Sequence, residues 1–258
     1  MLGKLLKYDL KWVFKLLVVF YVLTIFFALL GRGFGLIDNS SVFDFVSKLC
    51  YGTAISLSIS GLINNIMRLW ARYVNNIYKD ESYLTHTLPV TKNNIYLSKV
   101  LCSIITMSCS IVVAVINLVI CYSWDSLSKF IKMIIPGGDY TVIVILCLAV
   151  LVLEIFFLLY VGNLGITIGH RNNDNKMVMS IVVAFGAYMI SSTVSLIVLL
   201  ICGLFNNDLM KLFTSNNMIP DVDLFKFVLG VALFLYFMYI TICNVISYKL
   251  LTKGVNVD

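Results

Sequence analysis

The stretch that decides the fold is residues 140–168, YTVIVILCLAVLVLEIFFLLYVGNLGITI, which contains one acidic residue, Glu154, and no Lys or Arg. An apolar run of this length exceeds the roughly 20 residues that a helix needs to cross a bilayer. A membrane-spanning β-strand would instead alternate in hydrophobicity over about ten residues, and this run does not. The stretch therefore predicts a transmembrane helix.

Five further apolar runs, each bracketed by charged residues, are long enough to span a membrane. They lie at about 16–37, 49–67, 100–124, 177–205 and 227–248. The composition agrees, because 60% of the 258 residues are hydrophobic, 12% are charged and the mean hydropathy is +0.97. Soluble proteins carry about 25% charged residues. We therefore expect an all-α, polytopic membrane protein with six transmembrane helices in a single domain over 1–258.

The first fifteen residues, MLGKLLKYDLKWVFK, have a different pattern from the spans. At helical spacing their four lysines fall on one face, apolar residues lie broadly opposite, and Trp12 suits the headgroup boundary. We expect an amphipathic helix over 1–15 on the membrane surface, either as a simple positive anchor or as an elbow that touches a partner subunit. Asp9 lies in the apolar sector, where it is unfavourable unless it meets a polar partner. The first span is expected to be retained rather than cleaved as a signal peptide.

The distribution of Lys and Arg predicts the orientation. If both termini lie on one side, that side carries 13 of the 19 Lys and Arg residues. Because cytoplasmic loops are enriched in Lys and Arg, both termini are expected to be cytoplasmic. The net charge of +6 is then explained by this bias, and it does not require a nucleic-acid partner.

No motif for catalysis or nucleotide binding stands out. The chain has no GxxxxGK[ST] loop, and its two histidines cannot form HExxH. A triad of Asp80, Ser82 and His86 in an exposed loop is improbable as a catalytic site, since such residues are usually ordinary polar side chains. We therefore expect no enzymatic activity, no metal and no cofactor in this chain.

The segment between the second and third spans is the most distinctive. Residues 83–91, YLTHTLPVT, display apolar side chains in a polar cytoplasmic loop, where Pro89 ends any preceding turn and Thr91 is a candidate N-cap. This stretch resembles a similar one in bacterial ABC-2 type permeases, the membrane subunits of ATP-binding-cassette exporters. Chain length, six spans and the amphipathic amino terminus are also similar. Within the family the chain looks most like exporters of amphipathic peptides, such as phenol-soluble-modulin exporters.

The resemblance implies a mechanism and partners. Two copies of the permease would form a homodimer in the bacterial cell membrane, each docked on a separate ATPase subunit that binds ATP and Mg. The segment 82–94 would be the coupling helix. The loop 170–176 would be either a second contact or, as is more usual for such a sequence, a solvated turn. The implied ATPase-coupling residues are Tyr83, Leu84, His86, Leu88, Pro89, Thr91, Lys92 and Arg171.

Glu154 is the one acidic residue inside an apolar run, and no Lys or Arg stands in the middle of any run to neutralise it. It is either a neutral, hydrogen-bonded packing residue or part of the translocation path, and intramembrane acids favour the functional role. Rows of small residues indicate helix packing. These are Gly52, Ser56 and Ser60; Gly165 and Gly169; and Ala187, Ser191 and Ser195, the last a candidate dimer contact by resemblance to the family.

Three functions remain open at this point. The first is an exporter permease that moves amphipathic peptides or other amphiphiles out of the cell. The second is a self-sufficient ion-coupled carrier or channel built around Glu154. The third, a membrane enzyme, lacks a catalytic constellation.

Overall fold

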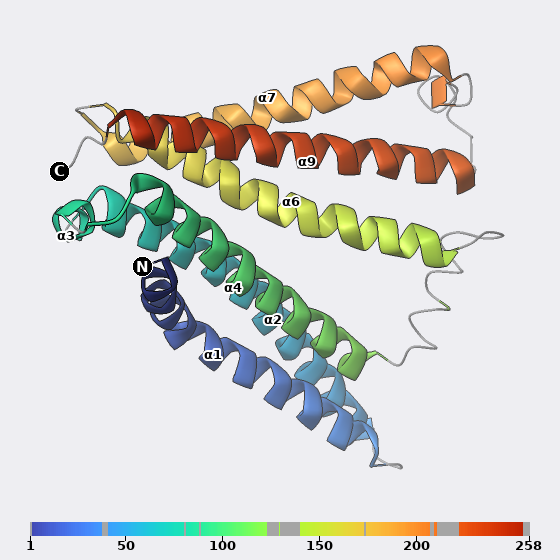
Figure 1. Cartoon of the computed structure of the whole chain (residues 1–258). Coiled ribbons are helices and arrows are strands. Elements are labelled where there is room, and N and C mark those ends of the chain that lie inside the picture. The colour runs from blue at the N-terminus through green and yellow to red at the C-terminus, as the bar shows by residue number, and fades with distance from the viewer. Residues whose placement is uncertain are drawn as a thin grey trace. The chain divides into compact units, whose positions relative to one another are not determined.

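The computed structural model describes residues 2–37, 41–79, 81–87, 89–122, 129, 140–172, 174–206, 209–210 and 222–254. Over these residues the chain is helical and contains no strand. The chain divides into two compact units (Figure 1). Unit 1 covers Met1–Ser128 with Val257–Asp258, and unit 2 covers Lys129–Asn256. Each unit contains three long helices, so the division separates the first three predicted spans from the last three.

Unit 1 consists of helices α1 (Leu2–Gly35), α2 (Ser41–Ile77), α3 (Ser82–Thr87) and α4 (Lys92–Cys121). The three long helices all contact one another, and α2 runs antiparallel to the other two (Figure 1). Their packing brings the start of α1, the end of α2, the short helix α3 and the start of α4 to the same end of the unit.

Unit 2 consists of helices α6 (Tyr140–Gly169), α7 (Lys176–Phe205) and α9 (Val222–Lys253). Helix α6 contacts both of the others, and α7 lies closest to it near the turn that joins them and diverges beyond (Figure 1). The chain turns from α6 into α7 at Asn175, whose φ of 51° is left-handed. Asn tolerates this conformation better than most residues, which suits it to so short a connection.

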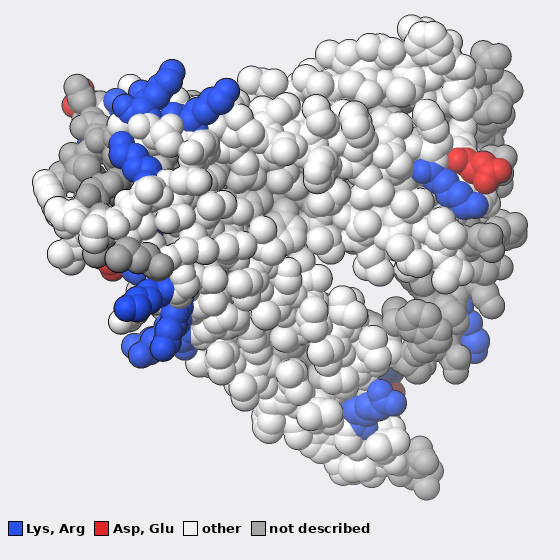
Figure 2. Space-filling view, viewed as in Figure 1, with Lys and Arg blue, Asp and Glu red and all other residues white. Residues whose placement is uncertain are grey.

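Six of the helices are long and apolar enough to cross a membrane. Only 6 to 22% of their most apolar windows is buried inside the protein, so most of this apolar surface faces outward, as lipid-facing helices require. In Figure 2 the Lys and Arg side chains lie at the ends of the helices, and the surface between them carries no charged residue on the face shown. The prediction of an all-helical, multi-pass membrane protein is confirmed.

The helix boundaries differ from the predicted ones mainly by being longer. Helix α1 is continuous from Leu2, so the segment 1–15 and the first span form one helix, whose first turns run in a different direction from the rest (Figure 1). Helix α2 starts at Ser41 rather than at 49 and continues past Arg68 to Ile77. Thr91 is the N-cap residue of α4, although its side chain makes no capping hydrogen bond.

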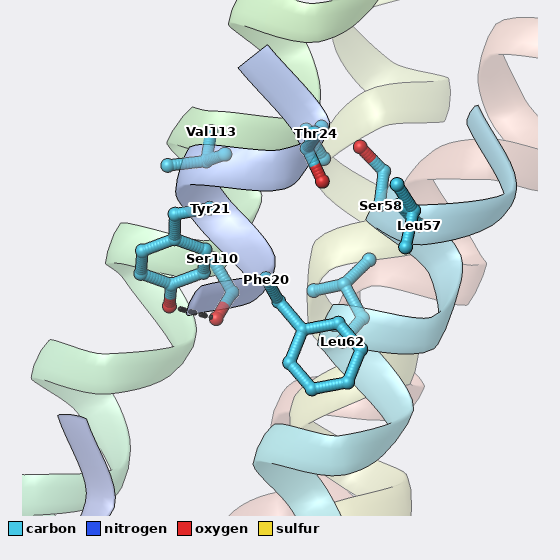
Figure 3. Close-up of a pocket in the computed structure, with 10 residues that line it drawn as sticks. Phe20, Tyr21, Thr24, Leu57, Ser58, Leu62, Ser110 and Val113 are labelled. Carbon is cyan, nitrogen blue, oxygen red and sulfur yellow. Dashed lines mark hydrogen bonds between the residues drawn. The ribbon is translucent and has the colours of Figure 1, made fainter. Parts of the chain in front are cut away.

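A row of polar side chains joins the helices of unit 1. In α4, Ser110 donates to its own helix at the Thr106 carbonyl and accepts hydrogen bonds from Asn65 of α2 and Tyr21 of α1, the latter at 2.5 Å (Figure 3). Tyr21 and Ser110 border a cavity of about 10 Å³, which is room for no more than about one water molecule. Further along, Asn117 donates to the Ala54 carbonyl and to Ser58. Hydrogen bonds between helices are a common means of association in lipid.

Unit 2 relies on close approach of small residues instead. A Cβ atom added at Gly169 of α6 would overlap the backbone nitrogen of Ser180 in α7. One added at Gly165 would lie 2.7 Å from the Cβ of Ala184. The predicted packing role of Gly165 and Gly169 is therefore confirmed, since only glycine allows the two backbones to come this near. The row containing Gly52 differs, because Gly52 has no atom within 4 Å of the position its Cβ would take.

Candidate functional site

A buried cluster of charged residues lies at the end of unit 1 that carries α3. At its centre is Asp9 of α1, which is only 2% exposed. The Lys99 ammonium of α4 donates to both Asp9 carboxylate oxygens, at 2.7 and 2.8 Å. The Arg72 guanidinium of α2 donates to the same carboxylate at 2.9 Å. The partner that the sequence demanded for Asp9 is therefore a pair of cations from two neighbouring helices.

A second layer of contacts extends the cluster toward α3. Arg72 also donates to both carboxylate oxygens of Glu81, at 2.9 and 2.7 Å, just before α3 begins. The Asn76 amide donates to Glu81 and accepts a hydrogen bond from Lys99 at 2.7 Å. Two acids and two bases thus balance in charge, which is the condition under which buried charges are tolerated. We call these five residues, Asp9, Arg72, Asn76, Glu81 and Lys99, the ion-pair cluster.

Trp12 covers one side of the ion-pair cluster. The guanidinium of Arg68 lies 4.3 Å from the centre of the Trp12 ring, and that of Arg72 lies 5.5 Å away. Arg68 also donates to the Trp12 backbone carbonyl at 2.5 Å. Cation–π contacts of this kind hold the first turns of α1 against α2. Trp12 therefore serves as a packing residue within the unit as well as a residue suited to the headgroup boundary.

Helix α3 is attached to this cluster through its first turn. Both the backbone nitrogen and the hydroxyl of Thr85 donate to the Glu81 carbonyl at 2.9 Å, and the Ser82 nitrogen donates to the Lys79 carbonyl at 2.7 Å. Ser82 and Thr85 are buried. The opposite face presents Tyr83, which is 66% exposed, and Leu84, which is 72% exposed. An apolar outer face is thus held on a firmly anchored short helix.

The structure brings together some of the predicted coupling residues and not others. Tyr83, Leu84, Pro89, Thr91 and Lys92 are all exposed along α3 and the start of α4. Leu88 and the side chain of His86 lie outside the described residues. Arg171 is exposed just after α6, in the other unit. None of the predicted set belongs to the ion-pair cluster.

Sequence reasoning missed the other four residues of the ion-pair cluster, including Arg72 and Lys99, the two that contact Asp9. The signal that could have found them was present, because an acid in an apolar sector needs cations, and Arg72 and Lys99 stand at the same predicted end of the second and third spans. What the sequence lacked was the rotation of each helix, which decides which of several nearby lysines and arginines points inward.

Glu154 lies in unit 2, beside a group of aromatic residues. Phe157, one turn further along α6, is buried and has the rings of Tyr188, Tyr236 and Tyr239 around it, with ring centres 6.1, 5.7 and 5.5 Å away. The Glu154 carboxylate is close enough to the Tyr236 hydroxyl group for the two to interact electrostatically. The carboxylate is partly exposed, and it makes no hydrogen bond or ion pair with any residue that the structure describes.

Residues Ala187, Ser191 and Ser195 of α7, predicted as a dimer contact, make contacts inside unit 2. The Tyr239 hydroxyl donates to the Ser191 carbonyl at 3.1 Å and lies 3.1 Å from the Ser195 hydroxyl. Ser191 is buried and Ala187 is partly buried. The row therefore packs at least in part against α9 of the same chain.

Comparisons with protein-family models, with curated proteins and with solved structures each gave no match to the chain. The functional argument therefore depends on the residues and geometry of this chain.

Proposed function

We propose that this chain is the membrane-spanning permease subunit of an ATP-driven exporter, similar to the ABC-2 type, which moves amphipathic peptides or other amphiphiles out of a bacterial cell. The observation that carries the proposal is α3, a short helix between two spans that displays Tyr83 and Leu84. Exposed Lys79 and Lys92 flank it, so this end lies in water rather than in hydrocarbon. Apolar side chains displayed in water favour a protein partner.

The ion-pair cluster connects α3, which displays Tyr83 and Leu84, to the three long helices of unit 1. Glu81 ties the start of α3 to Arg72, and Arg72 in turn contacts Asp9. A force applied to α3 by an ATPase subunit would thus reach α1, α2 and α4 through charged contacts rather than through a flexible loop. We propose that two permeases and two ATPase subunits form the working assembly, with ATP and Mg on the ATPase.

The proposed topology places both termini, α3 and the ion-pair cluster in the cytoplasm, and the first turns of α1 along the membrane surface. The support is the excess of Lys and Arg at these helix ends. Cysteine labelling in a variant without the seven native cysteines tests it. Lys92→Cys should react with an impermeant maleimide only after the cells are opened, and Lys226→Cys should react in intact cells. The reverse pattern contradicts the orientation.

The test of the permease assignment is co-expression with an ATP-binding-cassette subunit encoded beside this gene, followed by affinity purification. We expect the two to co-purify, and Tyr83→Ala or Leu84→Ala to weaken binding at least tenfold, since truncating a central apolar anchor costs about 2 kcal/mol or more. Leu36→Ala is the matched control, because Leu36 is 77% exposed at the opposite end of unit 1. Wild-type binding by both α3 variants excludes this docking surface.

A second function is favoured by one observation, the unpaired Glu154. A self-sufficient ion-coupled carrier would use such a carboxylate to bind and release protons or cations. Transport by the purified chain in liposomes, driven by a proton gradient without ATP and lost in Glu154→Gln, would support the carrier over the permease.

A further inference from the structure

Glu154 occupies a position in the membrane that ordinarily demands a partner. It lies about 21 Å from the start of α6, in the middle of a helix long enough to cross the bilayer. A charged group at this depth is unfavourable unless a polar or cationic group meets it. No residue that the structure describes hydrogen-bonds or ion-pairs with it.

The chain offers no cation of its own for this role. Every Lys and Arg except Arg32 stands outside the six apolar runs, and Arg32 lies near the far end of the first run rather than at its middle. A second copy of the chain would carry the same distribution, so pairing two copies does not bring a Lys or Arg to mid-membrane depth. A cation that meets Glu154 must therefore come from a ligand.

The surroundings of Glu154 have the chemistry of a cation site. Tyr188 and Tyr236 lie around Phe157, one helical turn from Glu154 on the same face of α6. Their hydroxyl groups make no hydrogen bond to any described residue, whereas the Tyr239 hydroxyl is occupied by Ser191 and Ser195. Aromatic faces beside a carboxylate are the usual environment for ammonium groups in proteins.

The surface around this group is apolar, which restricts the class of ligand. Leu151 and Leu158 on α6 and Phe234, Phe237 and Met238 on α9 are all between 42 and 65% exposed. A small hydrated cation would not leave water for such a surface, whereas the apolar body of an amphiphile would be stabilised there.

We propose that Glu154, Tyr188 and Tyr236 form a binding site for the cationic group of an amphiphile, with its apolar body against α6 and α9. Cationic amphiphiles would then be the substrates of the permease proposed above, and this assignment of substrates rests on the proposed function. Binding itself involves unit 2 only and needs no ATPase.

The experiment measures equilibrium binding of radiolabelled tetraphenylphosphonium to the full chain in phosphatidylcholine nanodiscs, without nucleotide. We expect saturable binding that dodecyltrimethylammonium displaces and that dodecanol and dodecyl sulfate, of equal chain length, do not. Equal displacement by all three would reduce the site to an apolar surface and overturn the proposal, as would an absence of saturable binding.

Variants locate the site. Glu154→Gln should weaken binding at least about tenfold, because a desolvated cation loses its countercharge. Asp223→Asn is the matched control, since it makes the same chemical change at an exposed end of α9, and it should bind as wild type does. Wild-type affinity in Glu154→Gln, or an equal loss in Asp223→Asn, contradicts the assignment.

A pair of substitutions at Tyr236 keeps the test decisive if Glu154→Gln fails to fold. Tyr236→Phe retains the ring and should stay within about threefold of wild type, whereas Tyr236→Leu should lose about tenfold, the usual range for a desolvated cation–π contact. Equal affinities in the two variants overturn the proposal. Cation binding without any ATPase partner would leave the site standing while the permease assignment fails, so the two failures are distinguishable.

Discussion

Unit 1 and unit 2 each pack three long apolar helices, but different side chains hold them together. In unit 1 the contacts are polar, from the ion-pair cluster through Tyr21 and Ser110 to Asn117. In unit 2 they are close contacts of Gly165 and Gly169 with α7, together with the aromatic group around Phe157. Lipid provides no hydrophobic drive for helix association, so close packing and hydrogen bonds between helices take its place. Each unit contains both, as the Tyr239–Ser191 hydrogen bond of unit 2 shows, but in different proportions.

The two acids, Asp9 and Glu154, make the difference sharper. Asp9 is nearly inaccessible and has two cations on it, which makes it part of the structure of unit 1. Glu154 is partly exposed and has no ion-pair partner among the described residues. A carboxylate that is fully paired contributes to folding, and one that is left unpaired is available to a ligand.

The largest effect is expected at the ion-pair cluster. Asp9→Leu should lower the free energy of unfolding by about 3–5 kcal/mol, because it leaves the buried Lys99 without its countercharge. The double variant Asp9→Leu/Lys99→Met should recover most of that loss. Detergent-unfolding titrations measure both.

The matched control for this prediction is Asp44→Leu, which breaks the exposed Asp44–Lys48 pair of α2. It should change the free energy of unfolding by less than about 1 kcal/mol, as exposed ion pairs contribute little. Equal losses in Asp9→Leu and Asp44→Leu would show that burial of the cluster has no energetic consequence.

The packing of unit 2 is tested by Gly169→Ala. The added methyl group would overlap the backbone of Ser180, and we expect a loss of about 1–3 kcal/mol in the free energy of unfolding. Gly186→Ala is the control, because no atom lies within 4 Å of its added Cβ. That change should be neutral or stabilising by up to about 1 kcal/mol, the helix preference of Ala over Gly. A stable Gly169→Ala would mean that α6 and α7 separate without cost.

A smaller effect is expected for Tyr21→Phe in the polar row of unit 1. Ser110 already donates to the Thr106 carbonyl, so Tyr21 is the donor in their contact, and its loss should cost about 0.5–1.5 kcal/mol. Tyr8→Phe, at a residue that is 68% exposed, should cost nothing measurable in the same titration. Equal stability of both variants would remove Tyr21 from the contacts that hold α1 to α4.

The smallest change in stability is expected at Glu154, in contrast to Asp9. Glu154→Gln should change the free energy of unfolding by less than about 0.5 kcal/mol, as expected where no structural contact is removed. A loss above about 2 kcal/mol in the same assay would mean that Glu154 has a structural partner, as Asp9 does.

The length and spacing of the apolar runs were enough to predict the six long helices, because crossing a bilayer requires a minimum length of apolar residues whatever the neighbouring helices do. The segment between α2 and α4 was predicted to display apolar residues, and Tyr83 and Leu84 are exposed there. The small-residue row at Gly165 and Gly169 was also predicted, since close helix approach depends on residue size.

The tertiary structure alone decided which polar residues meet. The sequence shows that Asp9 needs a partner, but the rotation of α2 and α4 selects Arg72 and Lys99, and that rotation results from packing over the whole length of the helices. The same holds for Ser191 and Ser195, whose small side chains suit any close contact and which here meet Tyr239 of α9. Local sequence determines which stretches of the chain form membrane helices, whereas the inward-facing side of each helix is a property of the three helices together.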